Sequence, residues 1–335
     1  MTTAEASPAK LRHDGAARHW EWHYLALMRR IWEEGDERID RTGIGTRSLF
    51  GTMLRFDLSG GRIPLLTTKR VFWKAAAREM LWFLTGNTSI RPLLEQGVTI
   101  WTDWPLAHYR RETGEDMAQA DFERRIVEDD AFAAQWGDLG PVYGKQWVDW
   151  PTYEEAGEAG GEGLYRAGPG INQVAQVVQS LREQPGSRRH IIEGWNVADL
   201  PRMALPPCHK TYQFHVAGQG QAKGEGKGRL NCLLYQRSCD VALGLPFNLF
   251  GAAMLTRMLA QQADLEPGEL VWTGGDTHLY LNHADLVAEQ LAREPEGEPV
   301  LTITRKPDSI FSYRFEDFEV HGYAPQGAIR APVAV

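Results

Sequence analysis

The sequence contains little cysteine, no long hydrophobic run and no excess of basic charge. Its three cysteines, Cys208, Cys232 and Cys239, are too few for a disulfide framework and lack the paired spacing of zinc ligands. No stretch of about 18 apolar residues occurs, so a membrane-spanning helix is not expected, and residues 1–18 lack the apolar core of a signal peptide. These absences exclude secreted disulfide scaffolds and membrane proteins, and they favour a globular protein of the reducing cytoplasm.

The net charge of the chain limits which binding partners are expected. The chain has 36 basic and 44 acidic residues, a formal net charge of -8. An acidic chain is poorly suited to non-specific binding of nucleic acid or of an anionic membrane surface. Any site for an anion must therefore be local, yet the sequence contains neither a glycine-rich nucleotide-binding loop nor a cluster of metal ligands.

The hydrophobic pattern predicts both helices and strands. Apolar residues at helical spacing predict helices, one of them apolar on nearly every side, and alternating residues predict strands. The helices are expected at about 24–31, 69–84, 171–181 and 247–259, and the strands at about 190–195, 211–216 and 229–236. Thr67 and Thr68 are expected to cap the helix at 69–84.

Composition also predicts how the chain is organised. Residues 1–19 have few large apolar side chains and predict a flexible tail ahead of a single domain at 20–335. Within that domain, the charged and helical stretch at about 105–136 predicts an inserted lobe. The glycine-rich stretches at about 154–170 and 217–228 predict surface loops.

The residues with the clearest catalytic potential lie around Cys208. The strands on either side of the loop at 217–228 are expected to pair, which brings Arg237 back towards Cys208. A free cysteine is only a few per cent thiolate near neutral pH, and a nearby guanidinium favours the thiolate. Cys208 is therefore a candidate nucleophile, although a lone cysteine is more often a small buried hydrophobe. Asn248, in the first turn of the last predicted helix, adds an amide that both donates and accepts.

Glu79 is a candidate for proton transfer. It is in line with Phe72, Ala76 and Phe83 on its predicted helix, which places a carboxylate on an apolar stripe. Desolvation raises the pKa of such a carboxylate and suits it to proton transfer. The alternative, a glutamate at the edge of the stripe that reaches water or a partner, fits the pattern equally well.

Arginines recur in predicted turns and at strand ends, namely Arg41, Arg188, Arg189 and Arg237. Adjacent arginines repel each other unless an anion lies near them. Each one taken alone is more often simply solvated. As a group, they indicate a ligand that carries a phosphate.

Aromatic residues indicate that the part of the ligand away from the phosphate is a flat ring. Trp101 and Trp104 could stack on a flat heteroaromatic ring, although aromatics at this spacing are more often core. Tyr143 lies between glycines, and His278 and Tyr280 belong to a polar cluster at a predicted strand end. With the arginines, the carboxylate and the amide, these groups suit a phosphorylated, flat, hydrogen-bonding substrate.

Several segments resemble those of folate-dependent thymidylate synthases, and they follow one another in that family's order. They are residues 40–46, 79–84, 140–147, 187–189, 207–209, 236–240, 245–248, 274–280 and 331–334. The resemblance runs from Trp22 to the last residue. It implies an α/β protein with a mixed, mainly antiparallel sheet and surrounding helices, which pairs with a second copy sheet against sheet.

The resemblance also implies a reaction. The substrates are dUMP and 5,10-methylenetetrahydrofolate, the products are dTMP and dihydrofolate, and no metal is needed. Cys208 would add to C6 of the uracil, so that C5 attacks the one-carbon unit of the folate. Loss of the C5 proton and elimination of tetrahydrofolate would leave an exocyclic methylene, which a hydride from the same folate reduces.

Residue roles are carried over with the motifs. Catalytic roles fall to Cys208, Glu79, Tyr143, Arg237, Asn248 and Asp240. The residues that would hold dUMP are Arg41, Arg188, Arg189, Arg237, Ser238, Cys239, Asp240, Asn248, His278, Leu279 and Tyr280. Those on the folate side are Ile100, Trp101, Trp104, Leu205, Asp240, Gly244, Phe247 and the C-terminal Ala334. Because Arg188 and Arg189 would come from the opposite subunit, the resemblance implies an obligate homodimer.

Two other functions stay open on the sequence. A pyrimidine deoxynucleotide hydroxymethylase would share the fold and the thiolate but deliver water instead of hydride; Asn248 opposes its cytosine form and Trp101 favours reduction. A non-catalytic nucleotide- or RNA-binding protein is opposed by the acidic net charge. Thr102 and Phe72 differ from the residues that many or some family members carry on the folate side.

Overall fold

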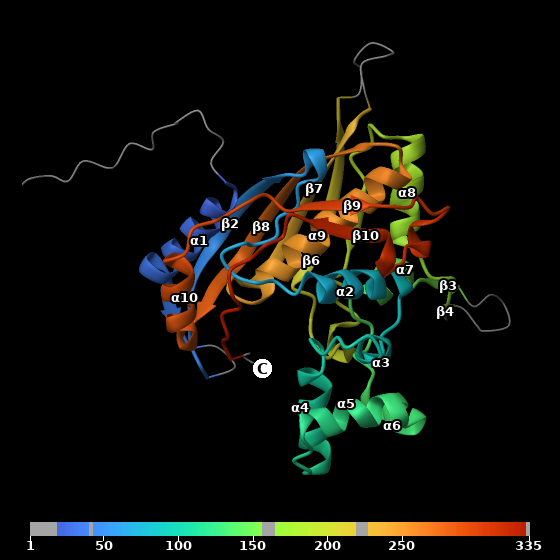
Figure 1. Ribbon diagram of the computed structural model, residues 1–335. Coiled ribbons are helices and arrows are strands. Elements are labelled where there is room, and N and C mark those ends of the chain that lie inside the picture. Colours follow the sequence, from blue (N-terminus) through green and yellow to red (C-terminus); the bar gives the residue numbers. More distant parts are fainter. Residues whose placement is uncertain (1–18, 40–42, 156–164, 219–226, 333–335) are drawn as a thin grey trace, which may run out of the picture.

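A six-stranded sheet forms the centre of the computed structural model, which describes residues 19–39, 43–155, 165–218 and 227–332. The strands follow the order β1-β2-β8-β7-β6-β5 (Figure 1). They are β1 (Asp36–Arg38), β2 (Thr46–Asp57), β5 (Ile191–Glu193), β6 (His209–Ala217), β7 (Arg229–Asp240) and β8 (Glu266–Tyr280). All neighbours are antiparallel except β7 and β8. The expected α/β fold with a mixed, mainly antiparallel sheet is thereby confirmed.

The parallel pair β7 and β8 decides where the site lies. Parallel neighbours need a crossover, which the helix α9 (Gly244–Gln262) provides. Nearly all of α9 is buried against β7 and β8, and Pro246 in its first turn needs no amide hydrogen bond. The register pairs Asp240 with His278, so the carboxyl ends of both strands meet at one edge of the sheet.

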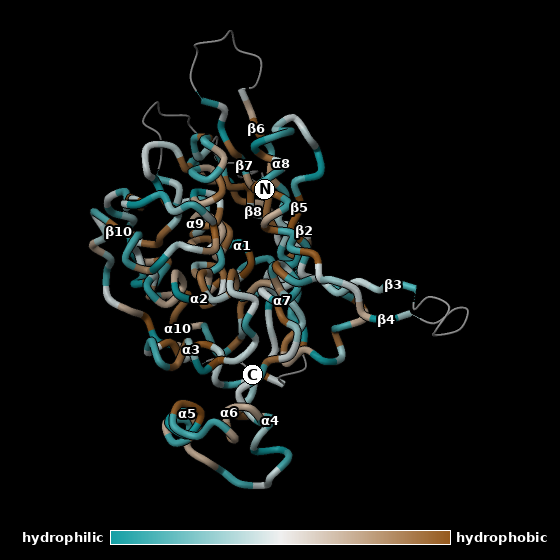
Figure 2. The backbone as a smooth tube through the Cα atoms, turned by 90° about the vertical axis from the view of Figure 1, so that its right-hand side faces the viewer, coloured by the Kyte–Doolittle hydropathy of each residue, from teal (hydrophilic) through white to brown (hydrophobic). Residues whose placement is uncertain are grey.

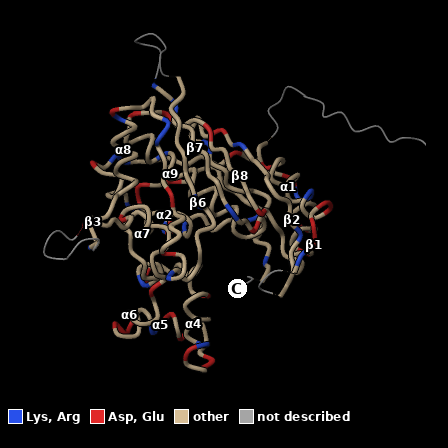
Figure 3. Tube along the Cα trace, turned by 180° about the vertical axis from the view of Figure 1, so that it is seen from behind, with Lys and Arg blue, Asp and Glu red and all other residues tan. Residues whose placement is uncertain are grey.

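Further helices surround this core. The longer ones are α1 (Glu21–Glu34), α2 (Trp73–Thr85), α8 (Gln173–Glu183) and α10 (Ala284–Leu291), and two short ones are α3 (Arg91–Leu94) and α7 (Gly144–Val148). Helix α1 packs on β2, α2 on α9, and α8 beside β5. Two small antiparallel pairs complete the strands, β3 (Tyr153–Glu155) with β4 (Tyr165–Ala167) and β9 (Val300–Ile303) with β10 (Phe318–His321). Figure 2 shows the hydrophobic residues concentrated along the sheet and α9, and Figure 3 shows acidic and basic residues interspersed.

The start of α2 differs from the prediction. The helix begins after Phe72, so the expectation that Thr67 and Thr68 cap it is wrong. Both threonines instead donate from backbone and hydroxyl groups to the buried carboxylate of Glu21, at 2.8 Å for both Thr67 groups and 2.9 Å for the Thr68 amide. A carboxylate with four donors is satisfied without water. Phe72, outside the helix and 59% exposed, does not extend the apolar stripe towards Glu79 as expected.

A three-helix lobe projects from the body (Figure 1). Its helices are α4 (Asp103–Thr113), α5 (Gln119–Glu128) and α6 (Asp130–Trp136). The Tyr109 ring lies 5.7 Å from Phe122 and 5.5 Å from Phe132, and all three are buried. The lobe therefore has a small aromatic core of its own.

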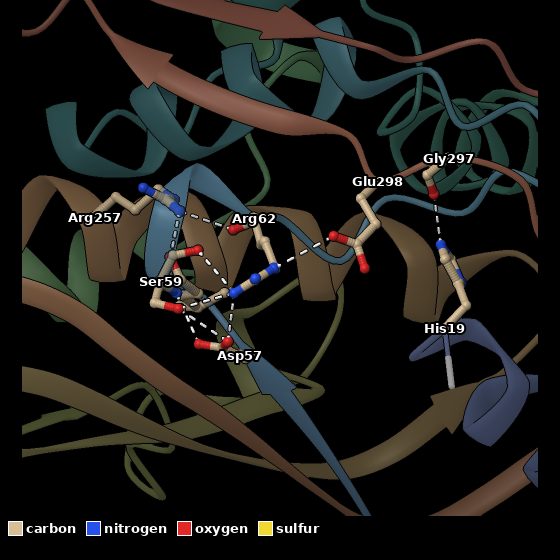
Figure 4. A network of polar contacts seen from close by, with 8 residues as sticks. His19, Asp57, Ser59, Arg62, Arg257, Gly297 and Glu298 are labelled. Atoms are coloured by element: carbon tan, nitrogen blue, oxygen red, sulfur yellow. Dashed lines mark hydrogen bonds and ion pairs between the residues drawn. The ribbon is translucent and has the colours of Figure 1, made fainter. Parts of the chain in front are cut away.

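A polar network joins the end of β2 to the segment before β9 (Figure 4). Arg62 donates to the carboxylates of Asp57 at 2.6 Å and Glu298 at 3.4 Å. Arg257 of α9 donates to the Arg62 carbonyl at 2.8 Å, and desolvation lowers its pKa to about 10, so it stays charged at neutral pH. Exposed ion pairs stabilise little. The network's main effect is to fix the turn that leads from β2 towards α2.

Several predicted features lie partly outside the described residues. Residues 1–18 of the predicted tail, 156–164 and 219–226 of the predicted loops, and the predicted site residues Arg41 and Ala334 are among these. The predicted loop at 154–170 contains the end of the strand β3 and all of the strand β4. No described helix is long and apolar enough to cross a membrane.

Candidate active site

Cys208 lies immediately before β6 and is half-buried. Its backbone N–H donates to the hydroxyl of Tyr143 at 2.8 Å, and its carbonyl accepts from the N–H of Arg237 on β7 at 2.8 Å. These bonds hold the backbone of the cysteine from both sides. The thiol is thereby presented at the end of the β6–β7 pair.

Arg237 is held beside the thiol by the backbone carbonyls of the two prolines that precede Cys208. Its Nε donates to the Pro207 carbonyl and its Nη2 to the Pro206 carbonyl, both at 2.8 Å. The same Nη2 lies 3.9 Å from the sulfur of Cys208, and the guanidinium lies 5.2 Å over the ring of Trp195. A positive charge at this distance favours the thiolate over the thiol. The remaining N–H groups of Arg237 can still donate to an anion.

The backbone of Tyr143 has unusual φ and ψ angles, which position its side chain. Its φ of 21° and ψ of -86° lie outside the regions that L-residues prefer, which costs on the order of 1–3 kcal/mol. Next to it, Gly144 lets α7 approach α2, because an added Cβ would lie 2.2 Å from the Phe83 carbonyl oxygen. Burial raises the pKa of Tyr143 well above its usual value, so the hydroxyl stays protonated.

His209, the neighbour of the candidate nucleophile, is a packing residue. It is buried, and its ring stacks on Tyr143 with 4.2 Å between centroids. Its Nδ1 lies 3.2 Å from the hydroxyl of Tyr212. Desolvation lowers its pKa to about 3, so the imidazole is neutral and cannot supply charge to the thiolate.

Glu79 has the properties of a proton-transfer group. It lies on α2, and one carboxylate oxygen accepts from the indole N–H of Trp101 at 2.8 Å. Desolvation raises its pKa to about 7, and the Trp101 hydrogen bond opposes this rise in part. A glutamate of this pKa can both accept and release a proton near neutral pH.

Two polar side chains, those of Asp240 and Lys69, contact the backbone just before the helix α9. One oxygen of Asp240 accepts from the N–H groups of Ala242 at 2.8 Å and Leu243 at 3.2 Å, which leaves its other oxygen for a ligand. The ammonium of Lys69 donates to the Ala242 carbonyl, and burial lowers its pKa to about 8. These contacts hold the chain just before the first turn of α9, and Asn248 follows that turn.

A relay of hydrogen bonds orients the amide of Asn248. The indole N–H of Trp272 donates to Gln236 Oε1 at 2.9 Å, and Gln236 Nε2 donates to Asn248 Oδ1 at 2.8 Å. An indole can only donate, so it determines which way round the amide of Gln236 stands. Sequence reasoning gave no role to Gln236 or Trp272, because the relay joins separate strands.

At the end of β8, His278 and Tyr280 form the other side of the site. An oxygen of Asp276 lies 3.1 Å from His278 Nδ1, and Arg38 of β1 donates to the other oxygen at 2.7 Å. The hydrogen bond with His278 lowers the pKa of Asp276, and the charges of His278 and Arg38 add to this. The sequence did not reveal this contact between Asp276 and His278.

Other predicted dUMP residues are arranged around this edge. The register pairs Ser238 with Asp276, beside Arg237. Cys239 and Leu279 are buried, so their side chains belong to the core and only their backbone atoms can face a ligand.

Arg188 and Arg189 do not join this site. They precede β5 and are exposed. In the register of β5 and β6, Ile191 pairs with Gln213 and Glu193 with Thr211, so the chain before β5 runs away from Cys208. At about 3.3 Å per residue, the two arginines lie roughly 20 Å from the thiol.

The folate-side residues predicted from the sequence are partly brought together. The rings of Trp101 and Trp104 lie 5.3 Å apart, and Trp101 also packs on Tyr143 at 5.8 Å. Gly244 approaches Asp240 and Asn248 at the start of α9. Ile100, Leu205 and Phe247 are half-buried against the core. Among the described residues, no group of three His, Cys, Asp or Glu side chains gathers in a way that could hold a metal ion.

A thiol beside a fixed guanidinium, close to a carboxylate whose pKa desolvation raises to about 7, is an arrangement typical of enzymes that use a cysteine nucleophile. Comparison with known proteins adds the family. The family model described as thymidylate synthase matches residues 22–335. The thymidylate synthase of Novosphingobium aromaticivorans is 72% identical over 97% of this chain and 99% of its own. Those of Sphingopyxis alaskensis and Rhizorhabdus wittichii are 65% and 60% identical, each over 95% of this chain and 98% and 99% of their own.

The chain belongs to the thymidylate synthase family. It is an enzyme that methylates dUMP to dTMP with methylenetetrahydrofolate as the donor, which confirms the function expected from the motifs. The hydroxymethylase and the non-catalytic binding protein are set aside by the same comparisons.

Proposed function

We propose that Cys208 is the nucleophile of this reaction and that Arg237 keeps it ionised. The 3.9 Å between Arg237 Nη2 and the cysteine sulfur is the observation that carries the proposal. The thiolate forms a bond to C6 of the uracil while the C5=C6 electron pair moves towards C5 and O4, so that C5 becomes nucleophilic. Bound methylenetetrahydrofolate supplies the one-carbon unit and the hydride.

Asn248 reads the base. Its Nδ2 donates to O4 of uracil, and its Oδ1, which has two lone pairs, accepts from N3–H as well as from Gln236. Cytosine presents the opposite pattern at both atoms. The relay from Trp272 holds the amide in the orientation that suits uracil.

The polar ends of dUMP are held by the groups around the sheet edge. Arg237 and Ser238 hold the phosphate with Arg41 of the same chain, and the backbones of Cys239 and Leu279 lie alongside. His278 and Tyr280 bind the sugar hydroxyl, and Asp276 supports this role because its carboxylate holds His278 Nδ1.

Glu79 moves protons through water on the O4 and folate side, and the Tyr143 hydroxyl helps to order that water. The pKa of about 7 supports this role. The folate is lined by Ile100, Trp101, Trp104, Leu205, Gly244 and Phe247. The free oxygen of Asp240 accepts from the pterin, and the C-terminal end with Ala334 closes over the bound molecules.

The protein works as a homodimer that pairs sheet against sheet. The sheet face turned away from α9 carries exposed apolar side chains, including Met53 at 54%, Ile191 at 40% and Leu233 at 37%. An apolar sheet face of this kind is typical of a surface covered by another subunit. Arg188 and Arg189, too far from their own Cys208, are then free to hold the phosphate in the partner's site.

The organisation of the chain supports two further points. It forms one catalytic domain at 20–335, from which the lobe projects. Cys208, Cys232 and Cys239 form no disulfide with one another, which supports a reducing compartment such as the cytoplasm.

Subunit mixing tests both the nucleophile and the shared site. Cys208→Ala is expected to bind dUMP but to form no dTMP, and Arg188→Ala is expected to be inactive for want of a phosphate ligand. A heterodimer of the two contains one complete site. Because random pairing makes half of the dimers mixed, about a quarter of the parent activity should return, measured as dihydrofolate formation. No recovery in confirmed heterodimers, or dTMP from Cys208→Ala alone, would contradict the proposal.

A further inference from the structure

The lobe reaches the proposed site through Thr102. This residue follows Trp101 and precedes α4, and it is fully buried. Its hydroxyl donates to Glu123 Oε1 on α5 at 2.8 Å. The neighbouring Trp101 donates its indole N–H to Glu79. Two side-chain hydrogen bonds on adjacent residues therefore connect the lobe with the carboxylate that transfers protons.

Glu123 is a fixed acceptor rather than a loose surface side chain. Gln119, one turn earlier on α5, donates to the same carboxylate oxygen at 2.8 Å. Phe122 and Ile126 of the same helix are buried in the lobe's core. The position of α5 is thus set by packing, and with it the position of the oxygen that Thr102 meets.

The lobe is also attached to the body at a second place. Arg91 of α3 donates to the Val127 carbonyl at 2.6 Å and to the Asp130 carboxylate at 2.5 Å. Two attachments prevent the lobe from pivoting about the segment that leads into α4. The Glu123 oxygen is therefore a fixed point relative to α2, which carries Glu79.

We propose that Glu123 is a positioning residue for the reaction: by accepting the Thr102 hydroxyl it holds the turn at 99–103 so that the Trp101 indole faces Glu79. The inference rests on the proposed role of Glu79 in proton transfer. A buried hydroxyl needs a partner, and without one the turn would shift to find it. Packing against Phe83 and Trp104 keeps the Trp101 ring buried, and the turn at 99–103 sets the backbone position from which its N–H reaches Glu79.

The charge state of Glu79 reports the position of Trp101. The phenols of Tyr143 and Tyr212 also interact with this carboxylate. Burial raises the pKa of both phenols well above the usual value, so both are uncharged near neutral pH. The Trp101 N–H is the donor that lowers the pKa of Glu79 against desolvation, so losing it raises that pKa above about 7.

The test removes either end of the bond. Thr102→Val keeps the shape and loses the hydroxyl, and Glu123→Ala loses the acceptor. In both variants the acidic limb of the kcat profile should move up by about half to one pH unit, and kcat at pH 7 should fall about two- to fivefold. Binding of dUMP without folate should not change. Glu123→Ala lies on the half-exposed side of α5, so it provides the test even where Thr102→Val does not fold.

The chain offers matched controls. Glu123→Gln and Thr102→Ser keep the acceptor and the hydroxyl and should behave as the parent. Gln119→Ala removes the other donor to Glu123 without touching the turn and should leave the profile in place. An unmoved profile in folded Glu123→Ala, or an equal shift in Glu123→Gln, would overturn the inference.

Failure of the proposed function can be told apart from failure of this inference. Glu79→Gln removes the carboxylate itself. If that variant keeps full turnover, the role of Glu79 is wrong. If it is inactive while Thr102→Val and Glu123→Ala match the parent, Glu79 keeps its role and the positioning by the lobe is wrong.

Discussion

Replacing Trp272 by phenylalanine tests how the base-reading amide is held. The change removes the N–H that donates to Gln236 Oε1 and keeps most of the apolar volume. Trp272 is fully buried and Gln236 is 2% exposed, so the acceptor is left without a partner. Leaving such a group unpaired costs about 1–3 kcal/mol of folding free energy. The melting temperature should therefore fall.

Part of this free-energy cost is avoided if the side-chain amides of Gln236 and Asn248 both rotate by about 180°. If the side-chain amide of Gln236 rotates in this way, its oxygen faces Asn248. The amide of Asn248 then rotates as well, so that its N–H groups point towards Gln236 and towards N3 of the base. The oxygen of Asn248 now faces position 4, a pattern that suits the amino group of cytosine. A hydrogen bond contributes about 0.5–1.5 kcal/mol, so dUMP binding should weaken by up to about tenfold while dCMP binding strengthens.

Equilibrium dialysis with labelled dUMP and dCMP measures this change in selectivity. Trp147→Phe is the matched control, because Trp147 is equally buried and its indole nitrogen has no hydrogen-bond partner. It should keep the parent's ratio of dUMP to dCMP affinity. The same ratio in Trp272→Phe would refute the relay as the device that orients Asn248.

Two further variants test the electrostatics and the packing of the site. Glu79→Gln should abolish turnover yet stabilise the fold above pH 7. Burial raises the pKa of Glu79 from 4.5 to about 7, so ionising it costs nothing below pH 4.5 and up to about 3 kcal/mol above pH 7. Urea unfolding at pH 4 and pH 8 should show a gain at pH 8 alone, and equal gains at both would contradict the assignment. Gly144→Ala should lose about 1–3 kcal/mol of unfolding free energy, since its Cβ meets the Phe83 carbonyl. Gly327→Ala meets nothing within 4 Å and is the control for thermal unfolding; equal melting temperatures would show that α2 and α7 separate easily.

The geometry of the site links folding with reactivity. The strained Tyr143 backbone, the close approach at Gly144 and the desolvated carboxylate of Glu79 each cost stability. They lie where α2, α7 and the start of β6 meet, next to Cys208. Costs of this kind concentrate at functional sites and are balanced by packing elsewhere, here by the buried helix α9 and the sheet beneath it.

Local pattern predicted the elements better than their ends. The alternation at 229–236 and the apolar residues at 247–259 correspond to β7 and α9, because each depends on which residues face the core. The start of α2 was misplaced because Thr67 and Thr68 satisfy Glu21, a residue distant in sequence, instead of their own helix. Tertiary contacts outweigh a local capping preference of about 1 kcal/mol.

By itself, the sequence determined the family and the reaction, since the motifs carry the chemical groups in a characteristic order whatever their distances. The tertiary structure alone decided which of these groups meet. Arg237 comes to the sulfur of Cys208 through the pairing of β6 with β7, whereas Arg188 and Arg189 are carried away from it by the register of β5. The orientation of Asn248 and the pKa of Glu79 are likewise absent from any linear pattern. Both arise from hydrogen bonds and desolvation, which depend on atoms brought together by folding.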